Sequence, residues 1–442
     1  PCLFTFTGEE GTAIVGLYVD DLLCASSGDF FKNFLLPKMQ EHFPAGITYE
    51  TAAQFLGTVI TRDRAKREIY LSQEARIAKL ADQFKITETF KTPLDMPKAE
   101  LQKLLSIDSL ALTPERKEEA VRIVNNDENL TKLKNYNNFK TYYRSYTGNL
   151  IYTVCFGRPD IQQTVYRLAR YQENPSELHI YAIRKVIGYL LGTKDKKLTF
   201  GRQRMIPTEE QPTSKGKTEL TAKPSDVLTT FSDSSFADCP ATRRSTGGYI
   251  HFLFGNYLAS RSFKINCVCR SVTEAEFYTM SAAAADAIYY RNLYNNTLRP
   301  VLVHLLDKED NDTSEFKDEI KQVVLLHRGL PDGNEQLLSP AIHPAQWLNS
   351  SDTVIYGDNK SAIGQIKNGM KKNCKHIQIH LSYIWEQMYI FRNIRIGKVC
   401  TNNNPADLQT KTLNGDLFRR HAATIMGENK SFTISNITFI YQ

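Results

Sequence analysis

The chain has 442 residues, which is enough for two or three domains that each bury a core. Hydrophobic residues make up 41% and aromatic residues 11% of it, so the composition excludes a wholly disordered chain. The formal net charge of +7 is compatible with a polyanionic partner, although charge alone does not establish one.

The first predicted element is a β-hairpin near the N-terminus. Apolar residues alternate in Ala13–Leu17 and Leu22–Ala25, and a short acidic segment, Tyr18–Asp21, separates them. At the hairpin tip, the carboxylates of Asp20 and Asp21 can hold Mg²⁺, which prefers oxygen ligands. Only 17 residues precede the acidic segment and the chain begins without Met, so we expect it to be part of a longer protein.

A helix, two strands and a second helix are predicted next. Gly28–Leu35 opens the first helix, and the strands are Phe55–Thr61 and Glu68–Leu71. Ser72 can cap the second helix. Four of its apolar residues recur at helical spacing: Ile77, Leu80, Ala81 and Phe84.

The middle of the chain is predicted to be helical and then irregular. Residues 141–195 divide into three helices, Tyr142–Val154, Pro159–Arg170 and Ser176–Gly192. Residues 201–226 are polar and nearly free of large apolar side chains, which is typical of a linker or an exposed loop.

From residue 227 onward, strands come first and then alternate with helices. The predicted elements are a strand at Val227–Asp233, a hairpin at Tyr249–Ala259, a helix from about Thr273 to Leu298, a strand at Val354–Asp358, two helices, a strand at Ile394–Cys400 and a final helix. A segment rich in acids and prolines, residues 307–350, interrupts this series. The order predicts an α/β (α+β) domain, in which helices flank a mixed sheet.

Four acids of this region stand at strand ends and helix starts. They are Asp233, Glu276, Asp358 and Asp407. Such acids can converge on one edge of a sheet and hold two Mg²⁺ about 4 Å apart, the arrangement for in-line phosphodiester hydrolysis. The spacing leaves the alternative open that the acids only end strands and cap helices.

Six strings in the same region are informative: Phe231–Asp238, Arg243–Tyr249, Ser271–Phe277, Tyr356–Ala362, Lys375–Ile377 and Ala406–Lys411. Together they resemble the ribonuclease H domain of copia-type retrotransposon polyproteins. The resemblance implies that the four acids are catalytic and bind two Mg²⁺, with Mn²⁺ as the alternative ion. Glu274 lies about 160° around the helix from Glu276, so the two cannot share one metal. We choose Glu276, because the family's ligand directly follows Ala.

Strings further upstream match the same family in order: Tyr18–Asp21, Phe55–Gly57, Tyr70–Gln73, Ser145–Leu150, Arg158–Ile161 and Tyr189–Thr193. The resemblance implies four regions: the C-terminal part of a reverse-transcriptase palm and thumb (1–95), a helical connection (96–200), a linker (201–226), and a ribonuclease H-like domain with a five-stranded mixed sheet (227–430) whose insertion covers about 307–350. Asp20 and Asp21 then belong to an incomplete polymerase site, because the family's third acid lies well upstream.

Five further residues are candidates for nucleic-acid contact. Arg243, Arg244, Ser245 and Thr246 form a loop that can bind phosphates, with a solvated turn as the alternative. His376 falls in the string Lys375–Ile377, and we expect it near the substrate or in product release. Its spacing to His380 could also bind a metal, but no third ligand accompanies the pair.

The predicted function is Mg²⁺-dependent hydrolysis of the RNA strand of RNA–DNA hybrids. DNA polymerisation belongs to the full-length parent and is not expected of this chain. The expected partners are the hybrid, a template–primer duplex and the missing upstream part of the polyprotein. The family usually has Asp and Trp where Ser235 and Phe236 stand. This departure keeps a catalytically inactive or repurposed nucleic-acid-binding remnant open, and the third alternative is a transposase or integrase.

The eight cysteines are scattered and form no CxxC pair, which is typical of free thiols in a reducing compartment. No apolar run approaches the roughly 18 residues of a membrane span. We therefore expect an intracellular protein, in the cytoplasm, in virus-like particles or in the nucleus, without a membrane partner. The sequence does not indicate an oligomeric state.

Overall fold

The computed structural model describes residues 2–43, 54–94, 104, 113–128, 132–201, 204–212, 218–222, 228–301, 304, 353–368, 377–391, 393–413, 415–428 and 431–439. The predicted insertion at 307–350 and His376 lie outside the described residues.

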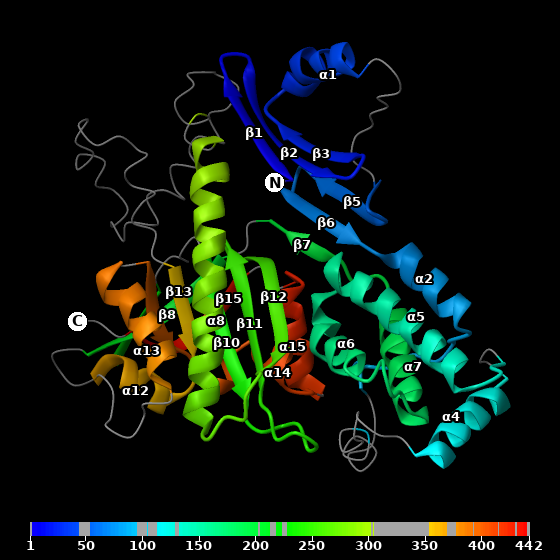
Figure 1. Cartoon of the computed structure of the whole chain (residues 1–442). Helices are drawn as coiled ribbons and strands as arrows, with labels where there is room; N and C mark the ends of the chain where they lie inside the picture. Colours follow the sequence, from blue (N-terminus) through cyan, green and yellow to red (C-terminus); the bar gives the residue numbers. More distant parts are fainter. Residues whose placement is uncertain are drawn as a thin grey trace.

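The N-terminal part is a three-stranded antiparallel sheet of β1 (Leu3–Gly8), β2 (Gly11–Tyr18) and β3 (Asp21–Ser26). Tyr18 pairs with Asp21, so the predicted hairpin is confirmed with its acidic tip. A π-helical turn, Phe31–Leu35, then leads into α1 (Leu36–His42), which lies beside this sheet in Figure 1.

A second antiparallel sheet follows the order β4-β5-β6-β7. Its strands are β4 (Gln54–Phe55), β5 (Thr58–Asp63), β6 (Glu68–Ser72) and β7 (Leu198–Phe200). Between β6 and β7 the chain forms helices α2 (Glu74–Gln83), α4 (Pro114–Asn126), α5 (Tyr136–Cys155), α6 (Gln162–Ala169) and α7 (Glu177–Gly192). The three helices predicted in 141–195 are therefore confirmed.

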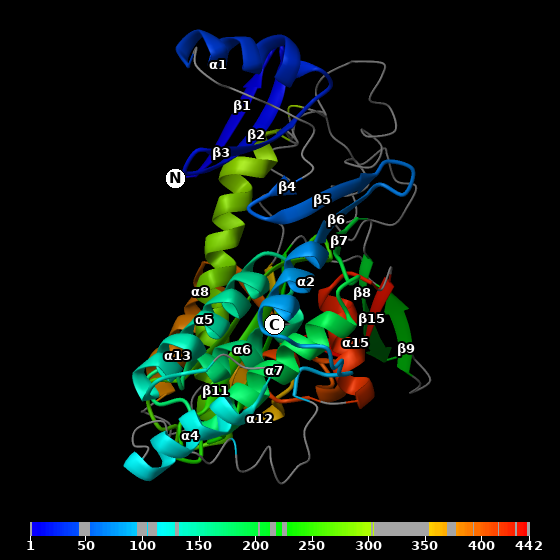
Figure 2. The same cartoon turned by 90° about the vertical axis from the view of Figure 1, so that its right-hand side faces the viewer.

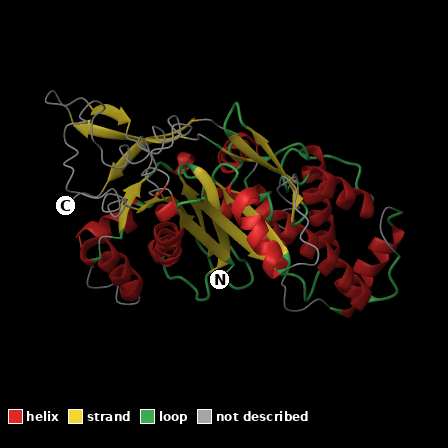
Figure 3. Cartoon of the chain, turned by 90° about the horizontal axis from the view of Figure 1, so that it is seen from above, coloured by secondary structure: helices red, strands yellow, loops and turns green. Residues whose placement is uncertain are grey.

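Local sequence sets the boundaries of these helices. The Asn135 side chain caps α5 by accepting a hydrogen bond from the amide of Asn138 at 3.0 Å. Ser176 and His179 form a capping box at the start of α7. Pro159 starts the short 3₁₀ turn Pro159–Ile161 that leads into α6, in keeping with the fixed φ of proline at a first helical position. Seen from above, these helices form a group to the right of the central strands (Figure 3).

The largest sheet contains the predicted five-stranded mixed sheet. Its strands β10 (Leu228–Ser235), β11 (Thr246–Leu253), β12 (Asn256–Lys264), β13 (Thr353–Gly357) and β14 (Ile394–Lys398) take the order β12-β11-β10-β13-β14. The ladders β12-β11 and β11-β10 are antiparallel, whereas β10-β13 and β13-β14 are parallel. The predicted mixed α/β class is thus confirmed.

Three further strands extend this sheet beyond β14, in the order β15 (Ser431–Phe439), β8 (Arg204–Pro212) and β9 (Thr218–Ala222). Two of them, β8 and β9, lie within residues 201–226, where the sequence predicted a linker or an exposed loop. A polar composition does not prevent pairing, because the ladder is built from backbone groups. The end of the chain supplies the partner strand, which local reading could not anticipate.

Helices cover both faces of the five-stranded sheet. One face packs against α8 (Val272–Leu293), α12 (Lys360–Asn368) and α13 (Gln378–Trp385). The other face packs against α14 (Asp407–Thr410) and α15 (Gly415–Ile425). Figure 2 shows α8 and α13 on one side of the molecule and α15 with β8, β9 and β15 on the other.

The α15 face and the group of helices share a single hydrophobic core. Phe231 and Tyr356 of the sheet belong to the same buried cluster as Tyr143 and Leu150 of α5. Tyr189 of α7 contacts Phe418 of α15 edge to face, with ring centroids 5.6 Å apart. The helices and this face of the sheet are therefore packed around the same core.

Polar contacts add to this packing at the edge strand β12. Gln162 of α6 donates to the backbone oxygen of Ser260 at 3.0 Å, and Arg167 pairs with Asp238 at 3.1 Å. Both sides of this ion pair are largely buried. Helix α6 thereby holds the loop that follows β10, which is one side of the site described next.

Candidate metal centre

Three of the four predicted acids meet at one edge of the five-stranded sheet. Asp233 lies near the end of β10 and Asp358 directly follows β13, and these two strands are parallel neighbours. Asp407 is the first residue of α14. One carboxylate oxygen from each of the three lies within 4.8 Å of the others. Among the described residues, these three acids form the group of side chains that lie close enough together to share a metal ion.

Glu276 lies in the first part of α8 and is 3% exposed. Burial raises its pKa well above the usual range, and the charges of Asp233 and Asp358 raise it further. Its Oε2 atom is buried and has no hydrogen-bond partner among the described residues. The fourth acid is thus close enough to Asp233 and Asp358 to interact with their charges, although it is not in the group whose oxygens all lie within 4.8 Å.

Glu274 forms hydrogen bonds at the start of α8. Its carboxylate accepts a hydrogen bond from the Arg270 amide at 2.5 Å, while the Ser271 side chain accepts one from the Glu274 amide at 3.1 Å. Ser271 is therefore the N-cap of α8, and the carboxylate of Glu274 satisfies the amide of the residue before it.

Two adjacent glycines let helices approach the site. Gly248 lies opposite Asp233 in the β10-β11 ladder, and a Cβ atom there would lie 2.6 Å from Cβ of Gln409 in α14. A Cβ atom on Gly247 would lie 2.6 Å from the Thr279 hydroxyl in α8. Sequence reasoning quoted both glycines within a string but assigned them no role. Their role depends on α8 and α14 packing on opposite faces of β11, which the sequence does not show.

Lys411 and Thr410 were also missed, although both lie in the quoted string Ala406–Lys411. The Lys411 ammonium lies 2.7 Å from Oδ1 of Asp407 and 3.3 Å from Oδ2 of Asp233. The Thr410 hydroxyl donates a hydrogen bond to Oδ2 of Asp233. Asn404 donates to the backbone oxygen of Ser232 at 2.9 Å and so ties the loop before α14 to β10.

The electrostatics of the cluster favour a bound cation. Burial raises the pKa of Asp233 to about 7, with Asp407 and Asp358 adding to the rise and Lys411 and Thr410 opposing it. Burial likewise raises the pKa of Asp407, against the effect of Lys411. The donor set is made of carboxylate oxygens, which suit hard divalent ions such as Mg²⁺ and Mn²⁺. Together with the unpartnered oxygen of Glu276, the residues present fit such an ion.

The predicted phosphate-binding loop divides into exposed and buried residues. Arg243 and Arg244 are exposed between β10 and β11. Ser245 and Thr246 are buried, and their hydroxyls are engaged inside the protein: Ser245 accepts from the Ala237 amide at 3.0 Å, and Thr246 donates to Asp238 at 3.1 Å. Within this loop, the two arginines are therefore the side chains that can reach a phosphate.

Asp20 and Asp21 are exposed at the tip of the β2-β3 hairpin. Val19 beside them has a positive φ of 54°, which a tight two-residue turn requires. In the described ranges, no third acid joins these two at a distance suited to a shared ion.

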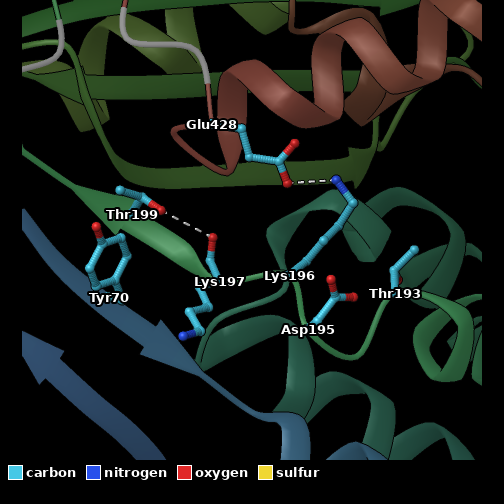
Figure 4. Close-up of a pocket in the computed structure, with 7 residues that line it drawn as sticks. All are labelled: Tyr70, Thr193, Asp195, Lys196, Lys197, Thr199 and Glu428. Atoms are coloured by element: carbon cyan, nitrogen blue, oxygen red, sulfur yellow. Dashed lines mark hydrogen bonds and ion pairs between the residues drawn. The ribbon is translucent and has the colours of Figure 1, made fainter.

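An open pocket lies away from these acids, between the end of α7, strands β6 and β7 and the end of α15 (Figure 4). Its lining residues are Tyr70, Thr193, Asp195, Lys196, Lys197, Thr199 and Glu428. An ion pair of 2.6 Å between Lys196 and Glu428 crosses it. The pocket therefore joins regions of the fold but contains none of the predicted site residues. As for a membrane, none of the helices described is both long and apolar enough to span one.

Comparison with curated proteins finds relatives along most of the chain. It is 26% identical over 424 residues (93% of the chain) to the "Retrovirus-related Pol polyprotein from transposon TNT 1-94" of Nicotiana tabacum. It is 26% identical over 283 residues (64% of the chain) to the "Retrovirus-related Pol polyprotein from transposon RE1" of Arabidopsis thaliana. The chain spans 24% and 16% of the lengths of these two relatives.

A third relative is similar to a smaller part of the chain. This is the "Secreted RxLR effector protein 161" of Plasmopara viticola, which is 31% identical over 147 residues, or 33% of the chain and 89% of that protein. No family model matches the chain, and no solved structure matches it.

Proposed function

Because the chain is a homologue of the retrovirus-related Pol polyproteins of copia-type transposons, we propose that it hydrolyses the RNA strand of RNA–DNA hybrids with Mg²⁺, or Mn²⁺, as cofactor. The observation that carries the proposal is the approach of Asp233, Asp358 and Asp407 to within 4.8 Å at the edge of a mixed sheet. A cation stabilises buried carboxylates that lie this close together, and divalent ions are the cations that serve phosphodiester hydrolysis.

Divalent ions bound at such acids activate the attacking water and stabilise the leaving 3′-oxygen. The residues of the chain would bind and orient them. Thr410 and Lys411 fix the carboxylate of Asp233, and the neighbouring Asp407 is held by the same lysine. Asp358 is only partly buried, so it gives the cluster an opening toward solvent, from which a phosphodiester can approach.

The proposed substrate contacts follow from the loop beside the acids. Arg243 and Arg244 are exposed there and can bind the phosphates of a duplex, which position the nucleic acid without reading its sequence. Discrimination of RNA from DNA would rest on the 2′-hydroxyls, which the wide minor groove of an RNA-containing duplex displays. We do not propose DNA polymerisation, since Asp20 and Asp21 have no third acid nearby in the described residues.

Asp358→Asn tests the proposal. The substitution removes the charge of the most accessible acid while keeping its shape. Cleavage of a labelled RNA–DNA hybrid should fall by about 10²-fold or more, whereas hybrid binding in the presence of Ca²⁺ should persist. The matched control is Asp416→Asn, because Asp416 has a side chain that is 97% exposed at the start of α15. Undiminished cleavage by the Asp358 variant would refute the assignment.

Ser235 and Phe236 favour one second candidate function, because they replace the Asp and Trp that usually follow the first acid in the resembling family. In this candidate the chain binds hybrids without cleaving them. Retained hybrid binding by the wild-type chain, with no cleavage at any Mg²⁺ or Mn²⁺ concentration, would favour the binding function over the nuclease.

A further inference from the structure

Lys411 supplies the acidic cluster with a cation from the chain itself. Its ammonium nitrogen lies 2.7 Å from Oδ1 of Asp407 and 3.3 Å from Oδ2 of Asp233. The side chains of the two acids are 4% and 2% exposed, whereas that of Lys411 is 35% exposed. The lysine therefore enters a buried site from its solvent side.

The position of Lys411 follows from the end of α14. Lys411 comes four residues after Asp407, and its amide donates to the Asp407 backbone oxygen at 2.9 Å. Residues four apart share a helix face, so the side chain of Lys411 passes directly over that of Asp407. Among the described residues, Lys411 is the cation that forms ion pairs with acids of the cluster.

Without a metal, this ammonium offsets a large electrostatic cost. Buried carboxylates at close range repel one another and lose the stabilisation of water. Lys411 reduces this cost at two of the acids at once. The free energy of the folded, metal-free state therefore depends on it.

When a metal ion binds, the same ammonium repels it and occupies carboxylate oxygens that the ion needs as ligands. Mg²⁺ lies about 2.1 Å from its oxygen ligands, so an ion bound to Oδ1 of Asp407 would lie within about 5 Å of the ammonium nitrogen. Oδ2 of Asp233 accepts a hydrogen bond from Thr410, and Oδ1 accepts one from Lys411 at 3.4 Å, so each oxygen of this carboxylate already has a donor. A divalent ion must therefore displace the ammonium or bind against its repulsion.

We propose that Lys411 is an internal counter-cation that competes with divalent metal for the oxygens of Asp233 and Asp407. It keeps the metal-free site folded, and it swings toward solvent when an ion binds. The long, partly exposed stem lets the ammonium leave without any movement of the backbone. This inference rests on the proposed function, since it concerns the same acids.

Lys411→Met in the full chain tests the competition, because Met keeps an apolar stem of similar length and removes the charge. In EDTA the variant should melt at a lower temperature than wild type, and saturating Mn²⁺ should close most of the gap. Calorimetry with Mn²⁺ alone should show about tenfold tighter binding, equivalent to about 1.4 kcal/mol. Lys411→Arg keeps the charge and should bind Mn²⁺ like wild type.

Lys66→Met is the control for net charge. Lys66 pairs with Asp63 at 3.3 Å in the turn between β5 and β6, and its side chain is 60% exposed. This variant changes the total charge as Lys411→Met does but leaves the cluster intact. Its melting temperature in EDTA and its affinity for Mn²⁺ should equal those of wild type.

A second measurement needs no variant. Reductive methylation of the wild-type chain, followed by peptide mass mapping, reports how accessible each lysine amine is. Mn²⁺ should raise the methylation rate of Lys411 severalfold and leave that of Lys66 unchanged. An unchanged or lower rate at Lys411 would overturn the competition.

The outcomes separate this inference from the proposed function. If wild type and Lys411→Met bind Mn²⁺ equally and melt alike in EDTA, the counter-cation role is wrong while the metal site stands. Weaker Mn²⁺ binding by Lys411→Met would also contradict it, because Lys411 would then assist the metal. If the wild-type chain binds no Mn²⁺, the metal site and the proposed function fail together.

Discussion

Asp233 and Gly248 lie directly opposite each other on β10 and β11, so their side-chain positions point to the same face of the sheet. The missing side chain of Gly248 is what lets α14 lie against that face. Through α14, this single glycine brings Asp407, Thr410 and Lys411 to Asp233.

Gly248→Ala should therefore damage the site without touching an acid. The new Cβ would overlap Cβ of Gln409 and Cγ2 of Thr410, at 2.6 and 2.8 Å. Overpacking of this kind costs about 1–3 kcal/mol of unfolding free energy, and it should reduce Mn²⁺ affinity by moving α14 outward. Denaturant unfolding and Mn²⁺ titration would measure both effects.

Gly148→Ala is the matched control for the glycine prediction. Gly148 lies inside α5, and a Cβ there would meet nothing within 4 Å. Alanine in this position should stabilise the chain by up to about 1 kcal/mol, because glycine is a poor helix former. Equal losses in the two variants would contradict the role of Gly248.

Glu276→Gln and Glu274→Ala should act in different ways. Glu276→Gln replaces a buried carboxyl whose raised pKa favours the neutral form, so the metal-free chain should lose little stability while Mn²⁺ binding weakens. Glu274→Ala leaves the Arg270 amide without its acceptor and should cost about 1 kcal/mol of stability with Mn²⁺ affinity intact. Thermal melts with and without Mn²⁺ distinguish the two. The reverse pattern would assign the ligand role to Glu274.

Arg158→Met should destabilise the helical region strongly. The guanidinium of Arg158 forms two hydrogen bonds of 2.9 Å to Asp160, and both side chains are essentially inaccessible to solvent. Removing one partner leaves a buried carboxylate unpaired, at a cost of about 3–5 kcal/mol. Arg144→Met breaks a partly exposed pair with Glu173 and should cost less than about 1 kcal/mol. Similar losses of unfolding free energy in the two variants would show that burial of the Arg158–Asp160 pair does not increase its contribution to stability.

His251 should make stability depend on pH. Burial lowers its pKa to about 3, and Thr230 contacts its Nδ1 at 2.8 Å. The unfolded chain protonates this histidine below about pH 6.5, whereas the folded chain does not. Its contribution is therefore complete above pH 6.5 and is lost as the pH falls, by about 1.4 kcal/mol per pH unit.

His251→Gln isolates that contribution from other titrating groups. Between pH 7 and pH 5, the free energy of unfolding of wild type should fall by about 2 kcal/mol more than that of the variant. Parallel curves from denaturant unfolding at both pH values would mean that the folded chain can protonate His251.

Much of the fold could be predicted from the sequence, and so could the approach of Asp233 and Asp358 to each other. Asp233 and Asp358 end strands that are parallel, so their positions at one edge follow from strand direction once the mixed sheet is predicted. The helices that contain Tyr143 and Ile183 could be predicted from the spacing of their apolar residues, because each helix buries a wide and regular face.

Other features depend on contacts between distant segments and could not be read locally. The hydroxyls of Ser245 and Thr246 were expected to face a phosphate, but the loop folds back so that Ala237 and Asp238 take them instead. Residues 204–212 form a strand because residues 431–439 pair with them, more than two hundred residues later. The role of Lys411 can be recognised only from the structure, in which its ammonium lies between Asp233 and Asp407.

The shared core between the helices and the sheet has a consequence for how the chain unfolds. Phe231, Tyr189 and Phe418 lie in one continuous buried cluster, so melting the helices exposes the underside of the sheet at the same moment. We expect one cooperative transition for both parts. A fragment that begins at residue 227 would present a wide apolar surface to water and aggregate. We therefore expect the sheet with its acids to fold only together with the helices that precede it in the chain.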